Sequence, residues 1–235
     1  MTEHTSKRFE DELAELKEKV LEMGALVEKA IHRSMSSLVD FDPKRARKVI
    51  ARDKDINQLE VDIDAMTNHL LALRQPAAGD LRFIIATIKV VTDLERSGDM
   101  AEGIAERTIQ SEDHPMTHVD SMEAMADLVV EQTRNALNAF ATGDVELALA
   151  VIAKDKKVNK MHRSIQREYI TYMLEDPREI TNGLASASVT KNLERMGDHA
   201  VNIAEMVIYM IEGYDVRHVA PKAAASMVHG EEIND

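Results

Sequence analysis

Cysteine and tryptophan are both absent from this chain of 235 residues, and aromatic side chains make up only 3% of it. Without cysteine there is no disulfide, no thiolate metal site and no cysteine nucleophile. Glycine and proline are also scarce, with nine and five residues, while Leu, Ile, Ala, Glu, Lys and Met recur throughout. This composition favours packed helices over sheet, so we predict an all-α protein.

Long hydrophobic runs are missing as well. The two longest candidates, FIIATIKVV and MVIYMI, are too short to cross a membrane, and the polar start MTEHTSKRFEDE has no signal-peptide core. The formal net charge is −13. Without a span or a signal core we expect a cytoplasmic protein. Because its charge repels nucleic-acid phosphates and anionic lipid, we expect no nucleic-acid binding and contact with a membrane only through partners. An acidic chain instead suits cations or a basic partner.

One phrase occurs twice. LERSGDMAEGIAE begins at Leu94 and LERMGDHAVNIAE begins at Leu193, with nine of thirteen positions identical. Asp53 and Asn57 also reappear, 102 residues later, as Asp155 and Asn159. The simplest explanation is a tandem duplication, with a first repeat over 1–112, a second over 113–218, and a tail over 219–235 that we expect to be poorly ordered.

Each half is predicted to form three helices, because apolar residues recur at spacings of three and four between a few breakers. The ranges are 7–40, 43–73 and 78–110 in the first half, and 118–142, 145–174 and 179–212 in the second. The connections are short, which predicts up-down antiparallel helices. We therefore expect two tandem three-helix bundles, or one bundle of six helices.

Acidic residues at helical spacing form the candidate site. Glu95 and Asp99 lie four apart and share a helix face, and Asp53 and Asn57 do so on the preceding helix. The two pairs lie at equal distances in sequence on either side of Pro76, in the turn between these helices. An antiparallel hairpin therefore places them at the same height along the two helices. The second half repeats this arrangement about the Asp176–Pro177 turn. The predicted ligands are Asp53, Asn57, Glu95, Asp99, Asp155, Asn159, Glu194 and Asp198.

An all-oxygen ligand set suits a hard cation such as Mg²⁺, Mn²⁺, Ca²⁺ or iron. Glu102, Glu106, Asn202 and Glu205 continue the acidic stripe and would extend it to more than one ion. The alternative is a solvated acidic face with ordinary charge pairing. His199 follows Asp198, but its counterpart in the first half is Met100, so we treat it as an optional ligand.

Gly98 and Gly197 stand at the same place inside the third helix of the first and second halves. A glycine inside a helix costs about 1 kcal/mol relative to alanine, so both positions predict close helix packing.

Enzyme motifs are lacking: there is no GxxxxGK[ST], GxGxxG, HExxH or GxSxG, and no histidine follows a glutamate by three residues. We therefore predict a protein that is not an enzyme.

The chain resembles the PhoU family of accessory regulators of bacterial phosphate-specific transport. The resemblance spans residues 7 to about 218 and rests on DLERSGD, NLERMGDHAVNIAE, the connector LLALRQPAAGDLR and the ending VRH. It implies an all-helical cytosolic homodimer that lowers phosphate uptake and the phosphate-starvation response when phosphate is plentiful. The implied partners are the ATPase subunit of the phosphate transporter and a sensor histidine kinase.

The resemblance also implies multinuclear metal clusters held by the paired acidic motifs, to which all eight predicted ligands correspond by position. One departure is Glu102-Gly103, where the second repeat has Val201-Asn202, the form associated with the family. Equal metal affinity of the two repeats is therefore not expected. Two other functions stay open, a metal-free helical adaptor and a redox or hydrolytic di-metal enzyme.

Overall fold

The computed structural model describes residues 2–111, 115–217 and 219–230, with the backbone alone for residues 2–6. Its described residues form helices and connecting loops without a β-strand. The elements are α1 (Thr2–Val39), α2 (Pro43–Arg74), α3 (Ala78–Gln110), α4 (Asp120–Thr142), α5 (Val145–Glu175), the 3-10 turn η1 (Pro177–Glu179), α6 (Ile180–Glu212) and α7 (Pro221–His229). The all-α prediction is confirmed, and the six predicted helices correspond to α1–α6.

Local sequence signals account for the helix ends. Asp42 accepts a hydrogen bond from the backbone N–H of Arg45 at 3.0 Å, and Pro43 is the first residue of α2. Asp144 caps α5 in the same way, through the backbone N–H of Leu147 at 2.9 Å. Between α4 and α5, Gly143 adopts the left-handed conformation, with φ of 69°, that ends a helix without steric cost.

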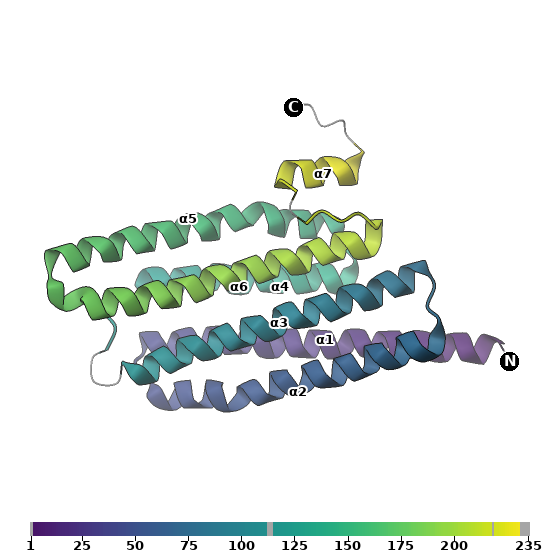
Figure 1. Cartoon of the computed structure of the whole chain (residues 1–235), viewed down its shortest axis with the longest axis horizontal. Coiled ribbons are helices and arrows are strands. Elements are labelled where there is room, and N and C mark those ends of the chain that lie inside the picture. The colour runs from purple at the N-terminus through teal and green to yellow at the C-terminus, as the bar shows by residue number, and fades with distance from the viewer. Residues whose placement is uncertain (1, 112–114, 218, 231–235) are drawn as a thin grey trace.

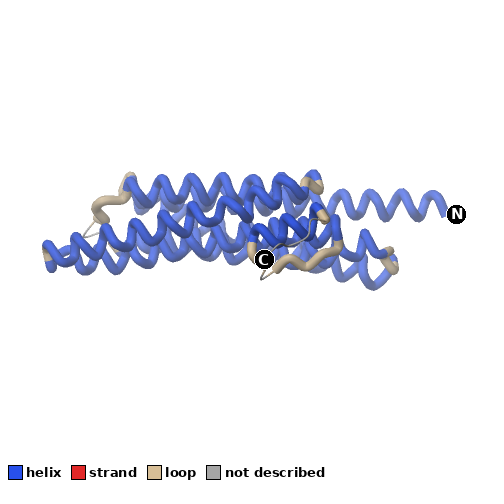
Figure 2. Tube along the Cα trace, turned by 90° about the horizontal axis from the view of Figure 1, so that it is seen from above, coloured by secondary structure: helices blue, strands red, loops and turns tan. Residues whose placement is uncertain are grey.

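The helices of each repeat pack on one another, and the repeats then pack side by side. The α1–α3 helices contact one another, as do α4–α6, while α3 lies against α6 and α1 against α4 (Figure 1). Figure 2 shows the result as one elongated bundle of nearly parallel and antiparallel helices. One cluster of buried apolar side chains runs through α1–α6, so both repeats share a continuous core.

Apolar residues in this core come from one face of each helix rather than from whole segments. Leu16, Val20, Met23, Val27 and Ile31 of α1 are fully buried at spacings of three and four, whereas charged residues occupy the opposite face. Within the described residues, none of the helices combines the length and apolarity that a membrane span requires.

The predicted poorly ordered tail is wrong for Pro221–His229, which form α7 on the side of α5 (Figure 1). Ala224 is 1% exposed, and Met227 and Val228 pack against the core. Proline at the first helical position and the alanines that follow favour a helix, and packing against α5 stabilises it. Residues 231–235 of the predicted tail lie outside the described residues.

Candidate functional site

The first repeat brings three carboxylates together across the α2–α3 hairpin. Asp53 comes from α2, and Asp99 and Glu102 come from consecutive turns of α3. One carboxylate oxygen of each lies within 4.8 Å of the others. Asp53 is 9% exposed, Glu102 is half-buried and Asp99 is exposed, so the group opens to solvent on one side. Asn57 donates a hydrogen bond from Nδ2 to Asp53 Oδ2 at 2.8 Å and thereby orients that carboxylate.

The charges of this group oppose one another. Burial raises the pKa of Asp53, and repulsion from Asp99 raises it further, against the hydrogen bond from Asn57 that lowers it. Burial also raises the pKa of Glu102, with added repulsion from Asp53. The pKa of Glu95 is raised by burial first and then by Asp99. A multivalent cation would offset both the lost hydration and the mutual repulsion of these carboxylates.

Gly98 lets α2 and α3 approach closely beside this group. A Cβ at Gly98 would lie 3.1 Å from Ile56 Cδ1 and 3.4 Å from Asp53 Oδ1. The second repeat shows the same approach, since a Cβ at Gly197 would lie 3.2 Å from Val158 Cγ1. The prediction that these glycines serve close helix packing is confirmed.

The second repeat holds a weaker version of the site. Asn159 donates from Nδ2 to Asp155 Oδ2, as Asn57 does to Asp53. Burial and then repulsion from Glu194 raise the pKa of Asp198. Glu194, however, accepts a hydrogen bond from Lys191 Nζ at 2.5 Å. Among the described residues no three acidic groups gather here as they do in the first repeat, because Val201 stands where the first repeat has Glu102.

Two buried oxygens of the second site lack hydrogen-bond partners, Asp155 Oδ1 and Gln132 Oε1. Both lie near Gly197, at 3.7 Å and 3.5 Å from the position that its Cβ would take. Burial raises the pKa of Asp155. Because a buried polar oxygen without a partner is costly, a cation coordinated by both oxygens would relieve the cost. A rotated Gln132 amide that donated a hydrogen bond to Asp155 would do the same.

Comparison with known protein families gives a separate match for each of the two repeats. The family model described as the PhoU domain matches residues 20–108 and again residues 122–207. The chain belongs to the PhoU family. The two PhoU domain matches correspond to α1–α3 and α4–α6, as expected for an internal duplication.

Curated relatives and solved PhoU structures cover nearly the whole chain. A phosphate-specific transport system accessory protein PhoU homolog from Pseudomonas putida is 42% identical over 238 residues, covering 100% of this chain and 93% of the relative. The accessory protein PhoU of Escherichia coli K12 is 32% identical over 234 residues, covering 99% of this chain and 97% of that relative. The crystal structure of PhoU from Pseudomonas aeruginosa matches with a TM-score of 0.85 and 42% identity, over 88% of this chain and 100% of that one.

The structure shows which of the predicted site residues lie close together. Asp53 and Asp99 meet across the hairpin as predicted, but the third carboxylate within 4.8 Å is Glu102 rather than Glu95. Asn57 and Asn159 act as hydrogen-bond donors to the aspartates. Sequence reasoning missed Glu60, whose pKa is raised by burial and then by Asp64 and Asp99. Its position seven residues after Asp53, two turns along the same helix face, was the available signal.

His199 does not point into the acidic site. Its Nδ1 lies 2.7 Å from Asp93 Oδ1, and Asn202 Nδ2 donates to the same oxygen at 3.0 Å. Asp93 belongs to α3 and is 8% exposed, so this buried polar cluster joins the two PhoU repeats where α3 packs against α6. At the equivalent position of the other repeat, Asn192 reaches the backbone oxygen of Met100 at 3.4 Å.

Proposed function

We propose that this chain is a metal-binding regulatory adaptor that lowers phosphate uptake and the phosphate-starvation response when phosphate is plentiful. It would do so in the cytoplasm, as a homodimer, between the ATPase subunit of the phosphate transporter and a sensor histidine kinase. Support for the pathway comes from family membership and from relatives named as accessory proteins of phosphate-specific transport. The same names support a regulator that is not an enzyme.

The observation that carries the metal proposal is the convergence of Asp53, Asp99 and Glu102 within 4.8 Å. Carboxylate oxygens from two helices suit a hard cation such as iron, Mn²⁺ or Mg²⁺. The bound ion would join α2 to α3 and offset the burial and the repulsion from Asp99 that raise the pKa of Asp53. In the second repeat, Asp155, Asn159, Glu194 and Asp198 would hold an ion more weakly, since Val201 replaces a carboxylate.

The metal test compares two double variants. Asp53→Ala with Asp99→Ala removes two of the three converging carboxylates, while Asp55→Ala with Asp127→Ala removes two exposed carboxylates elsewhere. Each protein is purified without chelator, and its metal content is measured by inductively coupled plasma mass spectrometry. We expect only the first variant to contain less metal than the wild type. Equal metal content in both variants and the wild type would refute the site. Circular dichroism shows whether each variant is folded.

The regulatory test uses cells that lack the endogenous gene for this chain. Alkaline phosphatase activity in phosphate-rich medium reports the starvation response, and we expect deletion to raise it and the wild-type chain to repress it. The Asp53→Ala, Asp99→Ala variant separates the two parts of the proposal. Full repression by a folded, metal-free variant would favour the metal-free adaptor, and normal repression after deletion would refute the regulatory role.

A further inference from the structure

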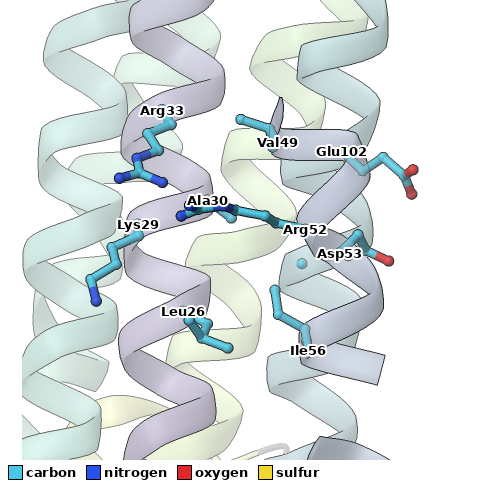
Figure 3. Close-up of a pocket in the computed structure, with 10 residues that line it drawn as sticks. Leu26, Lys29, Ala30, Arg33, Val49, Arg52, Asp53, Ile56 and Glu102 are labelled. Atoms are coloured by element: carbon cyan, nitrogen blue, oxygen red, sulfur yellow. The ribbon is translucent and has the colours of Figure 1, made fainter. Parts of the chain in front are cut away.

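The first repeat contains a groove between α1 and α2, on the α1 side of the acidic site. Its free space of about 430 Å³ includes the part that is open to solvent. Leu26 and Ala30 of α1 face Val49 and Ile56 of α2 across it, so the walls are apolar. Figure 3 shows the lining residues, with the carboxylates of Asp53 and Glu102 pointing to the side remote from α1.

Three cations stand at the mouth of this groove. Lys29 and Arg33 come from α1, and Arg52 of α2 extends toward α1 beside Ala30 (Figure 3). All three are exposed. Within the described part of the chain, their side chains make no hydrogen bond or ion pair. This is unexpected because the chain has 42 acidic and only 29 basic residues, so acidic partners are plentiful.

The second repeat has an equivalent groove, and its differences act as an internal comparison. Leu128, Val151 and Val158 repeat the apolar walls. Its charges are partly compensated, because Lys154, the counterpart of Arg52, pairs with Glu131 at 3.2 Å, which leaves Lys157 as its second cation. Lys29 corresponds to Glu131 and Arg33 to Asn135.

A further difference lies between the walls of the two grooves. The small Ala30 of the first repeat is replaced by Gln132, whose longer side chain lines the second groove and is 4% exposed. In the described part of the chain, only the first of these two grooves therefore combines three unpaired cations with walls free of a buried amide.

We propose that the α1–α2 groove of the first repeat is a docking site for an acidic segment of a partner protein. The segment would place an apolar side chain between Leu26, Val49 and Ile56, and its carboxylates against Lys29, Arg33 and Arg52. Exposed ion pairs contribute little by themselves, so a ligand that also fills the apolar walls has a clear advantage over a bare anion. The inference rests on the adaptor role proposed above but not on bound metal.

The first experiment identifies the occupant by its chemistry. The photoreactive residue benzoylphenylalanine replaces Arg33 in one full-length variant and Asn135, its counterpart in the second repeat, in another. After irradiation of cells, mass spectrometry identifies the cross-linked peptides. We expect Arg33 alone to cross-link a protein segment with an excess of Asp and Glu around an apolar residue. Absence of a cross-link at Arg33, or a segment without net negative charge, would overturn the proposal.

The second experiment measures binding of a fluorescent synthetic copy of the cross-linked segment to the full chain. Lys29→Glu with Arg52→Glu should weaken binding at least tenfold, whereas the control Lys154→Glu with Lys157→Glu, which changes net charge equally, should leave it within twofold. Ala30→Gln copies the second repeat and should weaken binding by placing a polar amide against the apolar walls. Equal effects of both charge-reversal pairs would overturn the site, since they would show attraction to net charge alone.

Two competitors and one chelator complete the test. Inorganic phosphate at millimolar concentration and vesicles with anionic lipid should not displace the peptide, and displacement by either would replace the proposed peptide with that ligand. Peptide binding should persist after EDTA removes metal. If the chain purified without chelator holds no metal but binds the peptide, the metal proposal alone is refuted. If it holds metal but does not bind the peptide, the groove alone is refuted.

Discussion

Replacing Glu102 with glutamine should stabilise the metal-free protein. Glu102 lies within 4.8 Å of both Asp53 and Asp99 through its carboxylate. At 4.8 Å a pair of unit charges repels by about 3.5 kcal/mol at an effective dielectric constant near 20, and by about 0.9 kcal/mol in water. Asp99 is exposed and its charge is well screened, so the lower part of this range applies. We expect Glu102→Gln to raise the free energy of unfolding by about 1 to 2 kcal/mol.

The assay is urea unfolding followed by circular dichroism at neutral pH, with EDTA and then with millimolar Mn²⁺. Bound metal stabilises the folded state by mass action, and we expect this stabilisation to be at least halved in Glu102→Gln because one ligand has lost its charge. Glu22→Gln, on the exposed face of α1, is the matched control. Destabilisation of the metal-free Glu102→Gln protein, or an undiminished effect of Mn²⁺, would refute the reasoning.

Three further predictions concern the helix interfaces. Asp93→Ala leaves His199 and Asn202 without their shared acceptor and should lower the free energy of unfolding in urea by about 3 kcal/mol. Its counterpart Asn192→Ala should lower it by under about 1 kcal/mol. Equal losses would contradict the difference between the two repeats. Gly24→Ala places Cβ 2.4 Å from a methyl of Leu137 and should lower stability by about 1 to 3 kcal/mol, whereas a Cβ at Gly79 meets nothing within 4 Å, so Gly79→Ala should leave the melting temperature equal or higher. Burial raises the pKa of Glu205 to about 7, so the folded state binds this proton more tightly than the unfolded state. The free energy of unfolding should therefore rise as pH falls from about 7 toward 4.5, and Glu205→Gln should flatten that rise.

Local sequence information was sufficient for α1–α6 and the duplication, but not for α7. The N-caps Asp42 and Asp144 begin helices, and Gly143 ends one. These helix ends depend only on residues nearby in the sequence. The identical LERxGD phrases located the same helix in both repeats. The hairpin about Pro76 also placed Asp53 opposite Asp99, because the spacing on each side of a short turn sets the height at which antiparallel helices meet.

Tertiary structure decided which side chains on those helices meet. The sequence set Glu95 and Glu102 on the same stripe as Asp99, but the rotation of α3 against α2 brings Glu102 to Asp53. The contact of Asp93 with His199 depends on how α3 packs against α6, and the uncompensated cations at the α1–α2 groove depend on how α1 lies against α2. Helical periodicity defines a face within one helix, whereas the rotation and offset between helices arise from packing of the whole core, which no short segment encodes.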